Sequence, residues 1–524
     1  MLPRRKKRLL LSPGKTQSLQ QQSPGIMWMR RDRLVVTLIL ATGFIADLYF
    51  NILPKVQEKY FKNDCTCQDF KTTGESNSSS SRDNWQNPST DTRLPITSEA
   101  GTLLSAQTQT GATGSQLQRL FSHPLYNIQT PDLRPEEYLL QREETLNYYI
   151  RKVSRWNRHQ RYYNTAANIS ATAQVVSFEP ESSWVKFHMG INRYALYSRD
   201  DPNIDQLLKD MGKIDIINAV VKPSGHHLKL SLKFQDFGKA MFKPMRQERD
   251  EETPEDFFYF IDFQRHNAEI AAFHLDRILD FRRVPPVVGR FINITKDILN
   301  TTRSEDLKSV FFTSPANNVC FFAKCLYMCK TEYAVCGNPD MLEGSLSAYV
   351  PGLTLAPRFS IPNPWIRSYT FANKEEWEVN PHYCDTIKQL YPYNSGNRLL
   401  NIIDMAIFDF LIGNMDRHHY EIFTKFGDDG FLLHFDNARG VKQSTLLRLK
   451  LLSQAEFRLS DLMRESLLRD NLPLVLTEPH LLALDRRLQR ILKAVQKCVK
   501  KYGEPHVVAE DITETQQHGH VTAR

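Results

Sequence analysis

The chain has 524 residues, 41% hydrophobic and 24% charged, and this composition excludes a wholly disordered, collagen-like or polytopic membrane protein. Its net charge of +8 comes from 67 Lys and Arg residues against 59 Asp and Glu residues. Residues 1–33 alone hold nine basic residues and one acidic residue, so the rest of the chain is neutral. The basic balance therefore gives no evidence for a nucleic-acid-binding body, and no nucleic-acid partner is expected.

An apolar run covers residues 34–45, directly behind these basic residues and shortly before Asp47. A basic flank followed by such a run is typical of a secretory signal or signal-anchor, although a buried core helix is the alternative. We expect a basic extension at 1–33 and a signal peptide or signal-anchor at 34–53. The rest of the chain would then lie in the lumen of the endoplasmic reticulum and Golgi or be secreted, attached to a membrane only through that anchor.

Sequons and cysteines agree with this compartment. The four Asn-Xaa-Ser/Thr sequons are candidate glycosylation sites, at Asn77, Asn168, Asn293 and Asn300. The eight cysteines form a close pair, a cluster and two single residues: Cys65 and Cys67; Cys320, Cys325, Cys329 and Cys336; Cys384 and Cys498. The cluster lacks the paired spacing of a zinc ribbon, so an oxidising lumen favours two local disulfides over a metal site.

Residues 54–118 are predicted to be a flexible stem, because the tract 68–118 contains few apolar residues to bury. A helical segment is expected at 119–220. Within it, the stretch 135–163 carries apolar residues at helical spacing with Arg and Lys between them: Leu139, Leu146, Tyr149, Ile150, Val153 and Trp156. Such a helix could bind RNA, but packing against a domain or a partner subunit is favoured, and we expect part of a dimer surface here.

The pattern becomes β from Lys222 onward. Leu228, Leu230, Leu232 and Phe234 alternate with polar residues, and a second strand ends in Lys243. A helix over 265–279 follows and is stopped by Pro285-Pro286. These elements predict a β-rich N-lobe at 221–346.

Helices dominate the rest of the chain. They are predicted over Leu399–Ile412, Ser453–Leu468 and Pro479–Val499, the last with Thr477 as its N-cap. The sequence thus predicts an α+β protein, in which an α-rich C-lobe at 347–503 follows the N-lobe with a cleft between them, and a flexible tail at 504–524.

Three residues stand in the order that phosphoryl transfer uses. Lys243 ends a strand of the N-lobe, Asp416 begins the run Asp-Arg-His-His-Tyr-Glu, and Asp436 lies twenty residues further on, after an expected strand at 431–435. The two aspartates resemble the catalytic-loop and metal-binding aspartates of kinases. No GxGxxG loop exists, so the usual kinase signature is incomplete. The histidine pairs 226–227 and 418–419 do not predict a metal site, because adjacent histidines rarely aim both rings at one ion.

Longer motifs carry a resemblance to a known family. They are Phe-Lys-Pro-Met from Phe242, Asp-Phe-Phe-Tyr-Phe from Asp256, residues 265–286, Gly-Asn-Met-Asp-Arg-His-His-Tyr-Glu from Gly413, and Leu-Asp-Arg-Arg-Leu from Leu484. This set resembles the secretory-pathway kinases called "family with sequence similarity 20", which include a Golgi casein kinase and a proteoglycan xylose kinase. Within the family, the pseudokinase branch is the nearest in sequence. The resemblance implies a two-lobed protein-kinase-like fold over residues 120–500.

The resemblance also implies roles for single residues. Asp416 would stand in the vestigial position of the catalytic base. The expected nucleotide-binding residues are His227, Lys243, the hinge residues Ser347, Ala348, Tyr349 and Val350, then Glu421 and Asp436. Active members have a glutamate metal ligand where this chain has Gln264.

The exchange of that glutamate for Gln264 removes a negative charge from the expected metal site. Hard divalent cations bind chiefly through carboxylates, so Asp436 would bind metal weakly or not at all. Glu269 should face another side of the helix and is no obvious substitute. The alternative is that Gln264 is tolerated and Asp436 alone holds the metal.

The chain departs from the family after Gly440. Relatives continue there with a stretch that ends in a Cys-Cys pair, whereas here Gly440 runs directly into Val441. In relatives those cysteines bond the residues matching Cys384 and Cys498, which are therefore expected to be unpaired or bonded to each other. Losing two disulfides would lower the stability of the C-lobe. In the cluster, the resemblance implies the pairs Cys320–Cys336 and Cys325–Cys329.

The leading hypothesis is a secretory-pathway pseudokinase. It would bind ATP without efficient divalent metal binding, form homodimers, and activate an active family kinase that phosphorylates secreted and biomineralisation proteins such as those of enamel. One alternative is an active Ser/Thr kinase that uses ATP with Mn²⁺ or Mg²⁺ on Asp436. Another is a structural scaffold that binds no nucleotide.

Overall fold

The computed structural model describes residues 114–127, 132–166, 176–221, 228–251, 266–322, 331–370, 372–434 and 441–511. All of them belong to one compact unit of the chain, Gln107–Arg524, whereas the other unit, Met1–Ala106, lies outside the described residues. The basic extension, the signal-anchor and most of the stem expected from the sequence are therefore outside them as well. No helix in the described ranges is long and apolar enough to span a membrane.

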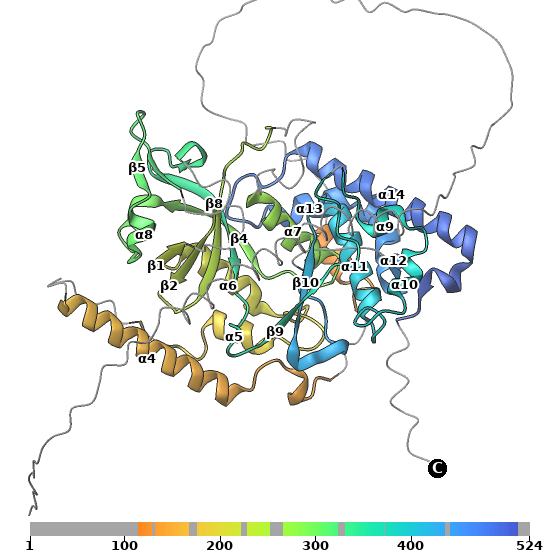
Figure 1. The fold of residues 1–524 in the computed structure, drawn as a ribbon, viewed down its shortest axis with the longest axis horizontal. Helices are drawn as coiled ribbons and strands as arrows, with labels where there is room; N and C mark the ends of the chain where they lie inside the picture. The colour runs from red at the N-terminus through yellow and green to blue at the C-terminus, as the bar shows by residue number, and fades with distance from the viewer. Residues whose placement is uncertain are drawn as a thin grey trace, which may run out of the picture. The chain divides into compact units, whose positions relative to one another are not determined.

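A five-stranded antiparallel sheet forms the N-lobe, with the strand order β1-β2-β3-β8-β4 (Figure 1). The strands are β1 (Ile216–Val221), β2 (Leu230–Phe234), β3 (Lys239–Pro244), β4 (Val287–Asn293) and β8 (Met341–Ala348). In β2, Leu230, Leu232 and Phe234 are buried and the residues between them are half-buried, because alternate side chains face opposite sides of a sheet. The predicted hairpin is confirmed by the antiparallel pairing of β2 with β3.

The sheet extends beyond both boundaries expected from the sequence. β1 pairs with β2 from Ile216 onward, so the N-lobe begins before residue 221. Its sequence hides this, because apolar residues stand on both faces: Ala219 is buried and its neighbour Val220 is exposed. At the other end, β8 runs through to Ala348 and crosses the boundary expected at 347.

Helix α7 (His266–Ile278) packs between this sheet and helix α13 (Leu459–Leu467) of the C-lobe. Ile270, Phe273 and Leu275 are completely buried along it. The helix expected at 265–279 is thus confirmed over its described residues. Beyond α7 the backbone turns sharply, with φ of 62° at Asp280 and 52° at Arg282.

The C-lobe is built mainly from helices. The helices are α9 (Glu376–Val379), α10 (Tyr383–Ile387), α11 (Arg398–Ile412), α12 (Gln443–Leu452), α13 and α14 (Glu478–Tyr502). Buried residues of α11 to α14 share one core with α7 and the sheet, and a second cluster lies around Ile402, Met405 and Tyr420. Short turns lie at Thr424–Asp429, Ala455–Phe457 and Glu504–His506. α11 and α14 match the predicted helices within a few residues.

The single helix predicted over Ser453–Leu468 is wrong. Ser453 caps the C-terminus of α12, and α13 starts only at Leu459. Apolar residues continue at helical spacing on both sides of the break, with Leu449 and Leu452 before it and Leu462 after it, all buried. The spacing therefore contains no sign of the turn between the two helices.

The N-terminal segment is attached to both lobes and is not a separate helical part. It contains α3 (Gln116–Phe121), a turn at Pro135–Glu137, α4 (Arg142–Ala166), α5 (Ser183–Gly190) and α6 (Pro202–Lys213). α3 packs on α13, and the Tyr126 hydroxyl donates to the Ile278 carbonyl at 2.7 Å. The helix expected from residue 135 begins at Arg142, because the Leu139 amide bonds to the Ile191 carbonyl instead.

Small sheets complete the described structure. β5 (Phe311–Thr313), β6 (Val319–Phe321) and β7 (Val335–Cys336) form one of them, beside a π-helix at Ile294–Leu299 and α8 (Glu305–Lys308). The disulfide Cys320–Cys336 joins β6 to β7 and is the pair that the resemblance implied. Cys325 and Cys329 lie outside the described residues. The other two sheets pair β9 (Arg358–Pro362) with β10 (His419–Phe423), and β11 (Val441–Lys442) with β12 (Val508–Ala509).

Candidate functional site

Lys243 and Glu269 form an ion pair between β3 and α7, with 2.5 Å between Lys243 Nζ and Glu269 Oε1. β3 places Lys243 opposite Ser345 of β8, and Glu269 lies in the first turn of α7. Burial raises the pKa of Glu269, but the charge and hydrogen bond of Lys243 outweigh burial and lower that pKa overall. Glu269 therefore stays ionised and fixes the ammonium of Lys243, as a helix glutamate does for the phosphate-binding lysine of kinases.

Glu269 has no role predicted from the sequence, and the ion pair supplies one. Helical periodicity relates Glu269 only to Gln264, which lies outside the described residues. The chain order could have indicated Glu269 as the partner of Lys243, because α7 is the first helix after the strand that carries Lys243. An acidic residue in the first turn of that helix is the natural partner for a strand lysine.

Asp416 lies in the loop between α11 and β10, close behind the end of α11. Gly413 ends the helix with φ of 77°, a left-handed conformation that glycine adopts without a steric penalty. The Asp416 amide then donates to Asn414 Oδ1 at 3.0 Å. The Tyr369 hydroxyl donates to Asp416 Oδ1 at 2.8 Å, so one oxygen of the candidate base already accepts a hydrogen bond.

The residue after Asp416 anchors this loop in the core. The guanidinium of Arg417 is buried and donates twice to Asp409 of α11, at 2.9 and 2.5 Å. Burial lowers the pKa of Arg417 to about 9, against the raising effect of Asp409 and Glu269. The Arg417 carbonyl accepts from Asn363 Nδ2 at 2.8 Å. These contacts hold the loop rigidly beneath Asp416, whichever chemistry it serves.

Glu421 stands on β10 and is paired with Arg358 of β9, with 2.7 Å between Glu421 Oε2 and Arg358 Nε. The strand expected at 431–435 is present only as an isolated bridge between Leu433 and Glu421 within the described residues. One bridge suffices to bring the chain that leads to Asp436 beside β10. Asp436 itself lies outside the described residues, and so does His227.

The four expected hinge residues differ in what their backbones can offer. Ser347 pairs with both neighbouring strands, and the Ala348 amide donates to the Pro286 carbonyl at 2.8 Å. The Tyr349 amide donates to the Lys239 carbonyl at 3.1 Å. Among the described residues, Val350 has no hydrogen-bond partner for its backbone. Val350 is therefore the hinge residue best placed to bind an adenine edge.

Comparison with known proteins identifies the family of this kinase-like arrangement. The family model described as "Golgi casein kinase, C-terminal, Fam20" matches residues 182–444 and 440–507. The chain belongs to the Fam20 family. It is 57% identical to human "Pseudokinase FAM20A", over 92% of this chain and 96% of that protein. It is 49% identical to human "Extracellular serine/threonine protein kinase FAM20C", over 77% and 72% of the two chains.

A solved Fam20 structure shares the fold. The "crystal structure of the Golgi casein kinase with Mn/ADP bound" superposes with a TM-score of 0.61 and 31% sequence identity, over 78% of this chain and 96% of that chain. The predicted fold class, a β-rich lobe followed by a helical lobe of the kinase type, is thus confirmed. The expected family is confirmed as well.

The two matched segments of the Fam20 model meet at residues 440–444. This is where the chain passes directly from Gly440 to Val441 instead of continuing as the sequence analysis expected of relatives. Cys384 on α10 and Cys498 on α14 are both free and exposed. Each therefore presents a thiol at the surface of a Fam20 chain that was expected to reach an oxidising compartment.

The two described sequons differ in geometry. Asn293 Oδ1 accepts from the Lys296 amide at 2.8 Å and caps the π-helix, whereas the side chain of Asn300 is exposed. The other two, Asn77 and Asn168, lie outside the described residues. Asn300 is thus the better-presented acceptor of the pair.

No group of three or more His, Cys, Asp or Glu residues that could hold a metal ion exists within the described ranges. His418 and His419 stack on each other, with ring centroids 4.3 Å apart. Both expected metal positions, Gln264 and Asp436, lie outside those ranges. The described part of the site therefore positions Lys243, the hinge and the loop that carries Asp416.

Proposed function

We propose that this Fam20 chain is a secretory-pathway pseudokinase, which binds ATP, transfers phosphate inefficiently and activates an active family kinase. The observation that carries the proposal is Gln264, at the position where active relatives are expected to have a glutamate metal ligand. The 57% identity to "Pseudokinase FAM20A" over nearly the whole chain supports the same conclusion. Its partner would phosphorylate secreted and biomineralisation proteins, including those of enamel.

The described residues fit a nucleotide. Lys243 would hold the phosphates, with its ammonium fixed by Glu269 at 2.5 Å. The backbone of Val350, which has no hydrogen-bond partner among the described residues, would bind the adenine edge. A bound ATP would supply the phosphoryl group, and the Mn/ADP complex of a relative shows that the family accommodates such a ligand. These contacts support nucleotide binding by this chain.

Phosphoryl transfer needs more than this, because divalent metal must neutralise the phosphates. Gln264 offers a neutral oxygen in place of a carboxylate. A unit charge near a dication contributes on the order of several kcal/mol even when it is well screened. Mn²⁺ or Mg²⁺ should therefore bind this chain poorly, and Asp416 would have no activated phosphoryl group to serve.

The test restores the missing carboxylate. Purified parent and Gln264→Glu proteins are assayed for phosphate transfer from ATP with Mn²⁺ to casein. We expect little transfer by the parent and a clear gain in the variant. The double variant Gln264→Glu/Asp416→Asn is the control and should lose that gain, because the base position is removed. A parent that matches an active relative would refute the proposal.

The second candidate is an active Ser/Thr kinase, and the intact Lys243–Glu269 pair favours it, since active kinases also require this pair. Asp416 is present as well, in a rigid loop. The casein assay separates the two candidates directly. Brisk transfer by the parent, lost in Asp416→Asn, would select the kinase.

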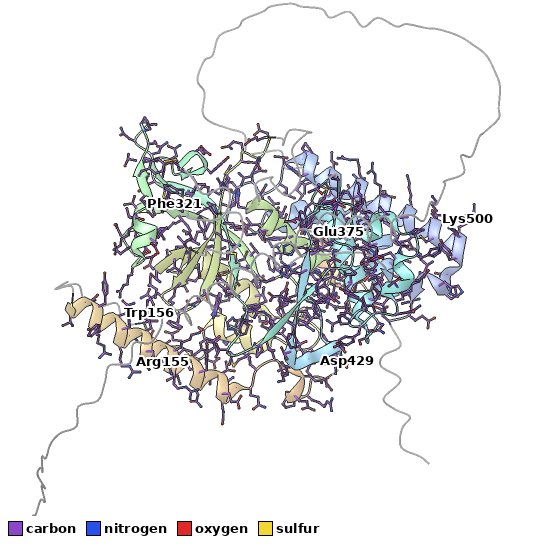
Figure 2. The ribbon with its side chains drawn as sticks, viewed as in Figure 1. Arg155, Trp156, Phe321, Glu375, Asp429 and Lys500 are labelled. Atoms are coloured by element: carbon purple, nitrogen blue, oxygen red, sulfur yellow. A yellow bond between two sulfur atoms is a disulfide. The ribbon has the colours of Figure 1, made fainter. Side chains whose placement is uncertain are left out.

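The proposed partner surface is the outer face of α4, and its residues differ from those expected. Tyr149 is buried and cannot contact a partner. Ile150 is 46% exposed and Tyr162 is 76% exposed on the same helix, of which Figure 2 labels Arg155 and Trp156. Ile150→Asp with Tyr162→Ala should prevent co-purification with an active family kinase. The control Tyr391→Ala removes an equally exposed tyrosine elsewhere, and equal losses in both would contradict this surface.

Golgi residence and secretion complete the proposal, supported by the names of relatives as extracellular and Golgi kinases. Glycosylation belongs to the same proposal, and the exposed Asn300 should carry a glycan. Glycosidase treatment of the secreted protein should lower its apparent mass. The shift should be smaller in Asn300→Gln, and an identical shift would exclude that site.

A further inference from the structure

Two buried hydrogen bonds connect helix α4 to the hinge. The Tyr149 hydroxyl of α4 lies 2.5 Å from His188 Nδ1 of α5. His188 Nε2 lies 2.8 Å from the Tyr349 carbonyl, which directly precedes Val350. Tyr149 and His188 are 7% and 3% exposed, so water cannot replace either bond at low cost.

The direction of these bonds follows from the chemistry of the groups. Burial lowers the pKa of His188 to about 4, so the ring is neutral and carries one N–H. The Tyr349 carbonyl can only accept, which places that proton on Nε2. Nδ1 is then an acceptor, and the Tyr149 hydroxyl must donate to it. The linkage therefore works in one arrangement, from Tyr149 through His188 to the hinge carbonyl.

The hinge backbone at Tyr349 is thereby held from two sides. Its carbonyl accepts from His188, while its amide donates to the Lys239 carbonyl of β3 at 3.1 Å. The two peptide units that flank the Tyr349 α-carbon are thus each held by one hydrogen bond, which restricts the rotation of both. The orientation of the next residue, Val350, is consequently set by these two contacts.

α4 is anchored a second time, on the hairpin of β2 and β3. Trp156 packs edge-on against Phe237 with ring centroids 6.4 Å apart, and Lys233 Nζ lies 3.4 Å from the centroid of the Trp156 ring. Tyr149 and Trp156 are seven residues apart, so they lie on the same side of the helix. One face of α4 is thus linked to the hinge through His188 and contacts the hairpin directly, so a shift of the helix changes both.

We infer that Tyr149 and His188 are positioning residues for the adenine end of the nucleotide site, and that α4 controls nucleotide affinity through them. The inference rests on the nucleotide binding proposed above. It adds that a macromolecule bound to the outer face of α4 and a nucleotide bound at the hinge affect each other's affinity equally, since such coupling is reciprocal.

The test removes one oxygen atom. Tyr149→Phe deletes the hydroxyl and keeps the ring, while Tyr148→Phe is the matched control, because the Tyr148 hydroxyl bonds only to Lys152 among the described residues. Calorimetry measures the affinity for ATP and for inorganic tripolyphosphate, which has no adenine. Tyr149→Phe should weaken ATP binding about fivefold, the effect of one buried hydrogen bond. Tripolyphosphate binding should not change. His188→Gln, which can donate to the carbonyl and accept from the hydroxyl, should restore part of the affinity lost in His188→Ala.

Equal weakening for both ligands, or none for ATP, would overturn the inference. Hydrogen exchange of the nucleotide-free protein separates it from the proposed function. Amides at 346–351 should exchange faster in Tyr149→Phe than in the parent or in Tyr148→Phe. Unchanged exchange would refute the linkage from Tyr149 through His188 to the hinge. A parent that binds no ATP would instead refute the proposed function. Faster hinge exchange in Tyr149→Phe would still support the linkage from Tyr149 through His188 to the hinge.

Discussion

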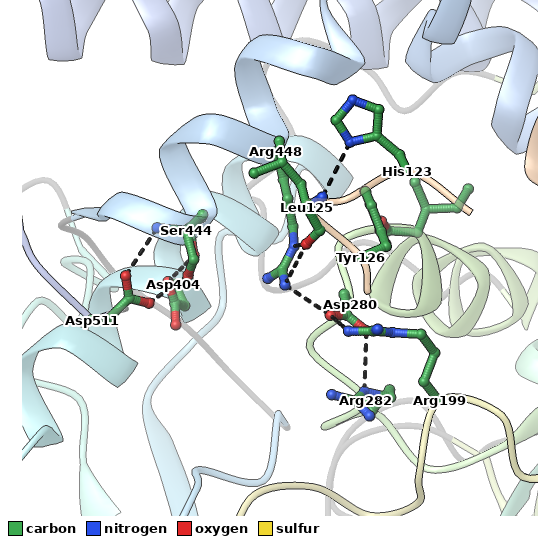
Figure 3. Close-up of polar contacts among 12 residues, drawn as sticks. His123, Leu125, Tyr126, Arg199, Asp280, Arg282, Asp404, Ser444, Arg448 and Asp511 are labelled. Carbon is green, nitrogen blue, oxygen red and sulfur yellow. Dashed lines mark hydrogen bonds and ion pairs between the residues drawn. The ribbon is translucent and has the colours of Figure 1, made fainter. Parts of the chain in front are cut away.

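Asp280 is the residue whose replacement should destabilise this Fam20 chain most clearly. Its side chain is 3% exposed and lies among three arginines (Figure 3). The Asp280 carboxylate accepts from Arg199 at 2.6 and 3.0 Å and lies 2.9 Å from Arg448 and 3.3 Å from Arg282. Because Arg448 belongs to α12 and Arg199 to the N-terminal segment, one carboxylate joins three parts of the fold.

Asp280→Asn isolates the charge, since asparagine also tolerates the left-handed φ of 62° at this position. The variant leaves three guanidinium groups without their common anion. Breaking a buried ion pair from one side costs about 3–5 kcal/mol. Urea unfolding followed by fluorescence should show a loss of this size. The control is Glu478→Gln, which removes a 2.7 Å pair with Arg464 at the surface and should cost less than about 1 kcal/mol.

The pH dependence gives a second test of the same reasoning. Burial raises the pKa of Asp280, but the charges of Arg282, Arg448 and Arg199 outweigh it and lower the pKa below its usual value. A lowered folded-state pKa contributes stability that is full above the unfolded value of about 4 and is lost as the pH falls through the folded value. The difference in the free energy of unfolding between parent and variant should stay constant from neutral pH down to about pH 4. It should then shrink as the pH falls through the folded-state pKa of Asp280. A loss under 1 kcal/mol, or a difference independent of acid, would refute the reasoning.

Three further predictions concern the site and its supports. Glu269→Gln should weaken ATP binding about tenfold by calorimetry, because Lys243 loses a charge-assisted hydrogen bond; equal loss in the exposed control Glu305→Gln would contradict this. Cys336→Ser should lower the free energy of unfolding by about 3 kcal/mol, since the disulfide closes a loop of 16-residue separation; an unchanged urea midpoint would count against it. Asp511→Ala should speed hydrogen exchange at residues 441–445, because the Ser444 amide and hydroxyl both donate to Asp511; exchange equal to the parent would show that the contact is dispensable.

Periodicity predicted the elements that have one buried face. The β2–β3 hairpin and α7 were found from alternation and from a helical stripe, and both are present. Elements with apolar residues on more than one side were missed. β1 and α12 are the two cases, because nothing in a local pattern reports which neighbour will cover each face.

The site was predictable as far as chain order specifies it. Lys243 and Asp416 follow from the order of motifs in a kinase-like chain, whereas the hinge was expected only from the family resemblance. Their partners depend on contacts between distant segments, such as Glu269 with Lys243, Arg358 with Glu421 and Tyr369 with Asp416. His188 is the extreme case, because it lies 161 residues from the carbonyl that it holds. A lone buried histidine carries no local sign of such a role.

The C-lobe was expected to be less stable because the chain lacks the two disulfides that relatives form after the position of Gly440. Other contacts hold the chain after this junction. Lys442 Nζ lies 2.8 Å from Asn401 Oδ1 and 3.4 Å from buried Asp404, which also accepts from Thr445 Oγ1 at 2.7 Å. Hydrogen bonds to charged groups contribute about 1.5–3 kcal/mol each, which is comparable with about 2–4 kcal/mol for a disulfide. The start of α12 is therefore secured by ionic contacts where relatives were expected to use sulfur. The strand that leads into α12, β11, is paired within the described residues only with the two-residue strand β12, so local unfolding of this lobe should begin at that pair and not at the free cysteines.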